Sequence, residues 1–175
     1  MKIIERASYI GHVEKLLGKG EVVVLTGHRR AGKSCILEKL AEKLAPKGHV
    51  IYLDMENPDN VFVDNYVALN EYIKANMIPA RQNFLLIDEV QEIDGFEKTL
   101  RFWAKQDLLE IIVTGSNAYM LSGELATIFA GRHSQKHVYS LDFPGFGESD
   151  NPPEAWGVPE YMQFLEDFIR IYDIK

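Results

Sequence analysis

The sequence of 175 residues has little of several features that mark particular classes of protein. Its one cysteine, Cys35, excludes a disulfide within the chain and fits a reducing compartment. No apolar run approaches the roughly 20 residues that a membrane-spanning helix needs. The N-terminus, M-K-I-I-E-R, carries charges where a secretion signal requires an apolar core. These absences predict a soluble, cytoplasmic protein that does not associate with membranes.

An excess of positive charge is also missing. The chain has 19 Lys and Arg against 26 Asp and Glu, which gives a formal net charge of −7. Domains that bind nucleic acid generally carry a basic surface, so DNA binding by this domain is not supported, although its charge leaves room for a local basic patch. The composition, 46% hydrophobic and 26% charged, is that of an ordinary globular protein.

Short apolar runs alternate with segments of helical periodicity. This alternation predicts an α/β fold, with a mostly parallel sheet covered by helices on both faces. The expected strands are 21–25, 49–53, 84–87, 110–113 and 137–141, and the expected helices are 8–17, 34–45, 63–77, 96–105 and 160–171. The alternation is interrupted at 143–159, which holds four of the seven prolines and indicates an irregular linker.

The stretch T-G-H-R-R-A-G-K-S joins an expected strand to an expected helix, and Gly27 to Ser34 matches the pattern G-x-x-x-x-G-K-[ST]. Glycines let such a loop close around an anion, and the helix N-terminus adds a favourable dipole. Lys33 can reach the β- and γ-phosphates of a nucleotide, and the hydroxyl of Ser34 can ligate Mg²⁺. A plain glycine-rich turn would not require these residue types together.

The predicted nucleotide-binding residues are therefore Gly27, His28, Arg29, Arg30, Ala31, Gly32, Lys33, Ser34 and Cys35. Arg29 and Arg30 could face either a phosphate or a partner. Cys35 is expected to be a small buried residue rather than a reactive thiol.

A second motif, F-L-L-I-D-E, places an acidic pair at the carboxyl end of a buried strand, where ligands of parallel sheets bind. Asp88 can hold Mg²⁺, and Glu89 can orient and deprotonate a water molecule. An ordinary acidic turn is an equally good explanation of this motif alone, but the phosphate loop upstream favours the functional interpretation. Gln91 could help to place the water or could cap a helix. A phosphate loop followed by such a glutamate points to hydrolysis by water rather than to phosphoryl transfer to a small acceptor.

A third strand end, I-I-V-T-G-S-N, could supply a side chain that senses the γ-phosphate. Ser116 is the main candidate, with Thr114 and Asn117 as alternatives. Spacing alone favours a simpler role, in which small polar residues cap the next helix.

These motifs, together with L-S-G-E-L-A-T-I-F-A-G-R-H, resemble the AAA domain of a prokaryotic group of predicted AAA+ ATPases. In that group the AAA domain precedes a C-terminal domain of unknown function. The resemblance implies a three-layer α/β/α P-loop NTPase of the AAA+ (ASCE) type with strand order 5-1-4-3-2. It also implies Walker A residues Lys33 and Ser34, Walker B residues Asp88 and Glu89, and a sensor at or near Ser116.

The resemblance covers about residues 3–143, so we expect the nucleotide-binding domain in 1–143. Residues 144–175 should hold a linker and the start of a C-terminal helical region. Arg132 takes the position of an arginine that senses the γ-phosphate, often on a neighbouring subunit. Without the resemblance, Arg132 would be interpreted as a solvated surface arginine.

The sequence thus predicts Mg²⁺-dependent binding and slow hydrolysis of ATP, with the ATP and ADP states acting as a switch. Arg132 acting in trans would require a homo-oligomer, and a protein partner of unknown identity is expected. The alternative is a nucleotide-binding module without turnover of its own, which engages a protein or DNA partner. A small-molecule kinase is disfavoured by the Asp88–Glu89 pair, and no N-K-x-D-like reader of guanine is present.

Overall fold

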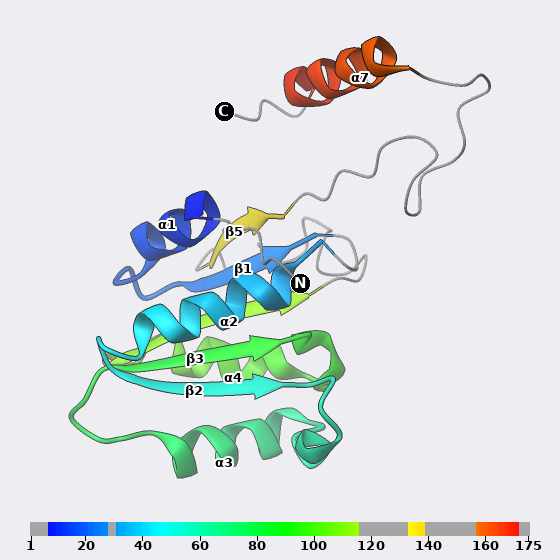
Figure 1. Ribbon diagram of the computed structural model, residues 1–175. Coiled ribbons are helices and arrows are strands. Elements are labelled where there is room, and N and C mark those ends of the chain that lie inside the picture. The colour runs from blue at the N-terminus through cyan, green and yellow to red at the C-terminus, as the bar shows by residue number, and fades with distance from the viewer. Residues whose placement is uncertain (1–6, 28–30, 116–132, 139–156, 172–175) are drawn as a thin grey trace. The chain divides into compact units, whose positions relative to one another are not determined.

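The computed structural model describes residues 7–27, 31–115, 133–138 and 157–171 (Figure 1). The chain divides into two compact units, Met1–Ser140 and Leu141–Lys175. The described part of the second unit is dominated by one helix, α7 (Val158–Ile171). The predicted boundary at 143 lies outside the described residues and stays a prediction. Within the described ranges, no helix is both long and apolar enough to cross a membrane.

The first unit is built on a parallel sheet of five strands in the order β2-β3-β4-β1-β5. The strands are β1 (Val22–Thr26), β2 (His49–Asp54), β3 (Asn83–Asp88), β4 (Leu109–Gly115) and β5 (His133–His137). Read from the other edge, this is the predicted order 5-1-4-3-2, which is confirmed. Every residue of β1 and β3 is buried, as expected for central strands covered on both faces.

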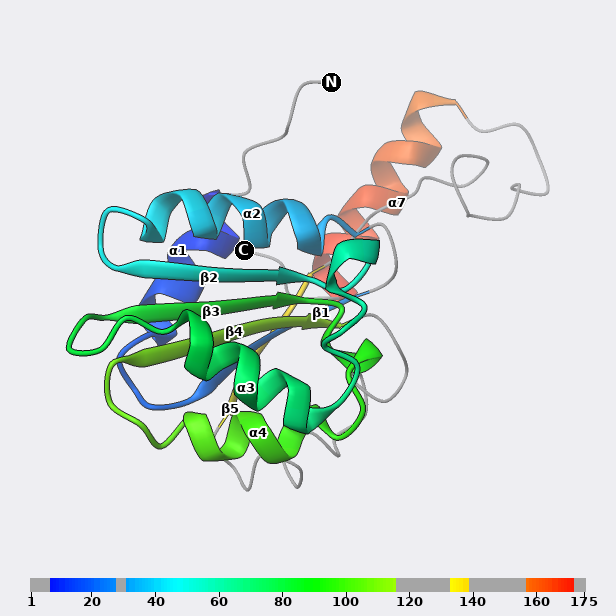
Figure 2. The same ribbon diagram turned by 90° about the horizontal axis from the view of Figure 1, so that it is seen from below.

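Helices cover the two faces of the sheet in pairs, which confirms the three-layer architecture (Figures 1 and 2). On one face, α1 (Ala7–Leu16) and α2 (Lys33–Leu44) pack on alternate strand residues such as Val23, Leu25 and Ile112. On the other face, α3 (Tyr66–Asn76) and α4 (Phe96–Trp103) pack on the intervening residues, such as Val24 and Ile87. The short 3-10 helices η1 (Pro58–Asn60) and η2 (Val90–Glu92) follow β2 and β3.

Most elements begin within two residues of the predicted start, and two begin further from it. Helix α3 starts at Tyr66 rather than at 63 because the Asn65 side chain accepts hydrogen bonds from the N–H groups of Val67 and Ala68 and so forms the N-cap. The last strand, expected at 137–141, is β5 at His133–His137. Among the described strands β5 pairs only with β1, and an edge strand needs no continuous apolar run.

Candidate functional site

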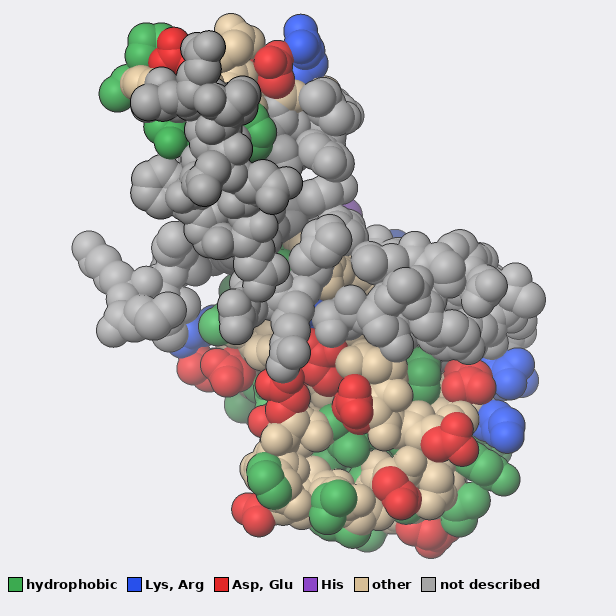
Figure 3. All heavy atoms as spheres, turned by 90° about the vertical axis from the view of Figure 1, so that its right-hand side faces the viewer, with side chains coloured by type: hydrophobic (Ala, Val, Ile, Leu, Met, Phe, Trp, Pro, Cys, Tyr) green, Lys and Arg blue, Asp and Glu red, His purple; other side chains and the backbone are tan. Residues whose placement is uncertain are grey.

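The carboxyl ends of β1, β3 and β4 lie side by side because these strands are adjacent and parallel. Figure 3 views this end of the sheet, and acidic side chains are spread over much of its described surface with few Lys or Arg among them. The acidic surface includes the end of β2, where Asp54 pairs in register with Asp88 of β3. An anion would therefore need a local group of donors in order to bind here.

The loop after β1 has the backbone that its glycines allow. Gly27 has φ 150°, and a Cβ at this position would lie 2.3 Å from the carbonyl oxygen of Val138, so a larger residue does not fit. Gly32 has φ 84° and is the N-cap of α2, whose first residue is Lys33. Both conformations favour glycine over residues with a side chain. His28, Arg29 and Arg30 lie outside the described residues.

Lys33 connects the loop with the acidic motif. Its side chain is only 3% exposed, and Nζ donates to the Gly27 carbonyl at 3.1 Å. Nζ also lies 3.7 Å from Oε1 of Glu89. A buried ammonium group is stable only with such partners. Two motifs that are far apart in the sequence thus meet at one charged contact.

Thr114, at the end of β4, holds the acidic pair in place. Its hydroxyl donates a hydrogen bond to Oδ1 of Asp88, a buried carboxylate. The hydroxyl oxygen of Thr114 also accepts a hydrogen bond from the backbone N–H of Glu89, at 2.9 Å. Thr114 was one of three candidates at this strand end. Ser116 and Asn117, and also Arg132, lie outside the described residues.

Glu89 lies in a left-handed turn with φ 52° and ψ 54°, which is unusual for a residue with a side chain. After this turn η2 begins, and Gln91 Nε2 donates to Oε2 of Glu89 at 2.6 Å. The carboxylate therefore has Lys33 near one oxygen and Gln91 on the other. Gln91 Oε1 is buried, and no donor among the described residues reaches it.

Ser34 and Cys35 form the first turn of α2. Ser34 is half-buried, at a position from which its hydroxyl could serve a bound cation. Cys35 is exposed, so the expectation of a small buried residue is wrong. The reason is helical periodicity: α2 buries Ile36, Leu37 and Leu40, whereas Cys35, Glu38 and Glu42 lie on its outer side.

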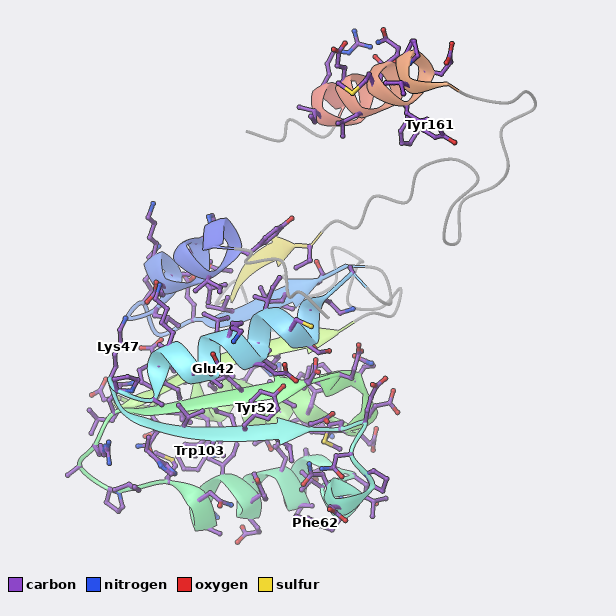
Figure 4. The ribbon with its side chains drawn as sticks, in the orientation of Figure 1. Glu42, Lys47, Tyr52, Phe62, Trp103 and Tyr161 are labelled. Atoms are coloured by element: carbon purple, nitrogen blue, oxygen red, sulfur yellow. The ribbon has the colours of Figure 1, made fainter. Side chains whose placement is uncertain are left out.

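Tyr52 is a further polar residue near the site that the sequence patterns did not single out. It lies on β2 and packs on the face of the sheet that α2 covers (Figure 4). Burial, followed by the nearby charge of Asp88, raises the pKa of the Tyr52 phenol, so this group stays protonated at neutral pH. No sequence signal distinguishes it from any other tyrosine in a strand.

The residue types gathered here are those that could hold a phosphate chain and a hydrated Mg²⁺. Lys33 is a buried cation beside the loop, and a hydroxyl such as that of Ser34 and a carboxylate such as that of Asp88 are oxygen ligands that Mg²⁺ prefers. Among the described residues, no three His, Cys, Asp or Glu gather into a metal cage. A cation held by one or two protein oxygens and by phosphates needs no such cage.

One protein family and several known proteins are similar to this chain. The model of a family described as an AAA domain matches residues 19–147. An uncharacterized protein of Haemophilus influenzae is 30% identical over 154 residues, which cover 85% of this chain and 38% of that protein. An uncharacterized protein of Methanocaldococcus jannaschii is 28% identical over 178 residues, with 97% of this chain and 39% of that protein covered. The chain therefore spans about two fifths of the length of these relatives.

A solved structure of low sequence identity has a similar fold. DnaA from Aquifex aeolicus, solved with AMPPCP bound, superposes with a TM-score of 0.51 and is 17% identical. The match covers 97% of this chain and 62% of that chain.

Proposed function

This chain belongs to the AAA-domain family, and on that premise we propose that it binds ATP with Mg²⁺ and hydrolyses it slowly. In this proposal residues 27–35 hold the phosphates, and Glu89 acts on the attacking water. Residues 1–143 form the nucleotide-binding domain, and the exchange of ATP for ADP is a switch that a protein partner responds to.

One observation carries this proposal: the side chain of Lys33 contacts both the loop carbonyl of Gly27 and the carboxylate of Glu89. The ammonium group that would bind phosphate thus lies 3.7 Å from the carboxylate that would activate water. A glycine-rich turn and an acidic turn with unrelated structural roles would have no reason to meet in this way. A carboxylate near the end of the phosphate chain favours water as the acceptor.

The residues divide the chemistry between them. Lys33 and the loop N–H groups neutralise charge on the β- and γ-phosphates, and Thr114 keeps the carboxylate of Asp88 in one orientation. Mg²⁺, when bound through Ser34 and Asp88, would neutralise further phosphate charge. Glu89 accepts a proton from water, the water oxygen bonds to the γ-phosphorus, and the bond from that phosphorus to the β–γ bridging oxygen breaks. The products are ADP and phosphate.

Binding of the triphosphate would also change the partners of Lys33. Its ammonium group would turn from Glu89 toward the phosphates, which removes one cationic neighbour from the carboxylate. Loss of that neighbour would make the proposed base a better proton acceptor when substrate is in place. Arg132 from a second copy of the chain would complete the charge neutralisation.

The test is ATP hydrolysis with Mg²⁺ measured against protein concentration, for the wild type, Glu89→Gln and Arg132→Ala. Glu89→Gln should lower kcat by about 10²–10⁴-fold and keep nucleotide affinity within a few-fold, because a general base contributes about that much. The matched control is Glu92→Gln, an exposed residue of the same 3-10 helix that should retain full activity.

Specific activity that rises with concentration and is lost in Arg132→Ala would support assembly with Arg132 acting in trans. ATP binding without turnover in any variant would instead establish the alternative, a nucleotide-binding module that depends on a partner.

A further inference from the structure

We propose that Gln91 is a positioning residue for hydrolysis: its amide nitrogen holds Glu89 in the orientation in which it acts on water. The inference rests on the proposed function. It follows from hydrogen-bond chemistry at Gln91, from the rigidity of the backbone that carries it and from the partners of Glu89.

The chemistry of the contact decides which way the amide of Gln91 faces. A carboxylate can only accept hydrogen bonds, so the group 2.6 Å from Glu89 Oε2 must be the amide NH₂. The amide oxygen therefore points away from Glu89. That oxygen is buried and receives no hydrogen bond from the described residues. A buried acceptor of this kind is costly unless a donor reaches it.

This unpaired oxygen argues against the simpler role of Gln91 as a helix-capping residue. A capping amide uses its oxygen to accept hydrogen bonds from backbone N–H groups at the start of a helix. The N–H groups of Glu92 and Ile93 are instead paired with the backbone carbonyls of Glu89 and Val90, both at 3.1 Å. Gln91 thus directs its donor to the catalytic candidate and leaves its acceptor unused by the described chain.

The backbone around Gln91 is held firmly enough to make the contact reproducible. Val90 and Ile93, on either side of it, are buried in the core under α3 and α4. The N–H of Glu89 is bonded to Thr114, which fixes the left-handed turn before η2. Gln91 is therefore attached to a structure that does not depend on a bound ligand.

Two of the partners of Glu89 differ in what would happen when ATP binds. Lys33 is a cation that phosphates would attract away from Oε1. Gln91 is neutral and has no comparable reason to leave Oε2. Gln91 would therefore still orient the Glu89 carboxylate when the nucleotide is bound.

The experiment compares single-turnover hydrolysis and MgATP binding in the wild type, Gln91→Met, Glu89→Gln and the double variant. Methionine keeps the length of the side chain but removes donor and acceptor. We expect kcat to fall about 10–100-fold with nucleotide affinity unchanged, as for outer residues that orient a catalytic group. In the Glu89→Gln background the same change should cost less than about 3-fold, because Gln91 acts through Glu89.

Two further variants keep the result interpretable. Gln106→Met, an exposed glutamine after α4, is the matched control and should behave as the wild type. Gln91→Glu keeps an acceptor, loses the donor and adds a like charge beside Glu89, so it should lose at least as much activity as Gln91→Met. Thermal unfolding of each variant verifies that it is folded.

Each outcome decides the matter. Wild-type hydrolysis with an unchanged kcat in Gln91→Met, or an equal loss in both backgrounds, would overturn the inference and leave the proposed function standing. A wild type that binds ATP but hydrolyses none would overturn both.

Discussion

The two ends of β3 each carry a buried polar side chain, and they handle it in opposite ways. At the amino end, Asn83 is fully buried, donates to the carbonyls of Ile78 and Arg81 and, at 3.4 Å, Leu108, and accepts from the N–H of Ile78. At the carboxyl end, the Asp88 side chain accepts one hydrogen bond from the Thr114 hydroxyl.

The difference separates a structural polar group from a candidate functional one. The Asn83 amide is neutral and uses its donors and acceptor on the protein itself, so it fastens the turn before β3. The acidic pair at the other end is held by neutral neighbours and lies near the ammonium group of Lys33, with Nζ 3.7 Å from Glu89 Oε1. Carboxylates grouped with a cation are what the proposed site needs in order to bind a nucleotide with Mg²⁺.

The largest effect is expected for Asn83→Asp, which gives the amino end of β3 the residue type found at its carboxyl end. A carboxylate cannot donate to the carbonyls that Asn83 serves, and its charge would be buried among acceptors. We expect a loss of about 3 kcal/mol or more in the free energy of unfolding at neutral pH, measured with urea. Asn57→Asp is the control, because Asn57 is exposed and caps η1 with an oxygen that aspartate also has. Equal stability of the two variants would contradict the structural role of Asn83.

The reverse change, Asp88→Asn, tests the carboxyl end of β3 by separating stability from hydrolysis. The oxygen that accepts from Thr114 is retained, so the free energy of unfolding should change by less than about 1 kcal/mol. Hydrolysis should fall by about 10²-fold or more, because the proposed carboxylate ligand of Mg²⁺ is lost. The two quantities are measured on the same preparation. A variant that loses stability but not activity would place Asp88 with Asn83 among structural groups.

The smallest effect on the free energy of unfolding is expected for a surface charge that lies at neither end of β3. Glu14 of α1 lies 2.7 Å from Lys43 and 2.8 Å from Lys47, and hydrogen bonds from these lysines lower its pKa (Figure 4 labels Lys47). Because folding lowers this pKa from 4.5, the stabilisation is present above that pH and is lost as the pH falls through the folded-state value.

Glu14→Gln should therefore destabilise the protein by less than about 1 kcal/mol at pH 7, and the difference should shrink in salt and vanish in acid. Urea unfolding at pH 7 and below pH 4 measures it. A difference that persists in acid would show that packing, not charge, is lost.

Much of the fold was predictable because the central strands are buried on both faces. β1, β3 and β4 must be continuous apolar runs, and such runs are visible in the sequence. β5 is an edge strand with the sequence H-S-Q-K-H, which has no apolar run. The apolar residues that begin at Val138 therefore placed the predicted strand at 137–141 instead. Helix bounds shifted where a side chain such as that of Asn65 forms a cap, because caps depend on single hydrogen bonds.

The site was predictable as a set of residue types but not as a set of contacts. The loop pattern and the acidic pair named Lys33, Asp88 and Glu89, and parallel topology explains why they lie at one edge of the sheet. The direction of Gln91 depends on the left-handed turn at Glu89, a conformation that no residue type there announces. The exposed position of Cys35 follows from which side of α2 faces the sheet, and residue preference alone pointed the wrong way.

The close approach of Gly27 to Val138 brings two distant parts of the sequence together at the start of the loop. The N–H of Val138 donates to the Thr26 carbonyl at 2.6 Å, and the backbone of the next residue, Gly27, packs where no side chain fits. A residue larger than glycine at position 27 would therefore have to push Val138 away from the end of β1, so this position also sets how closely the edge of the sheet can pair.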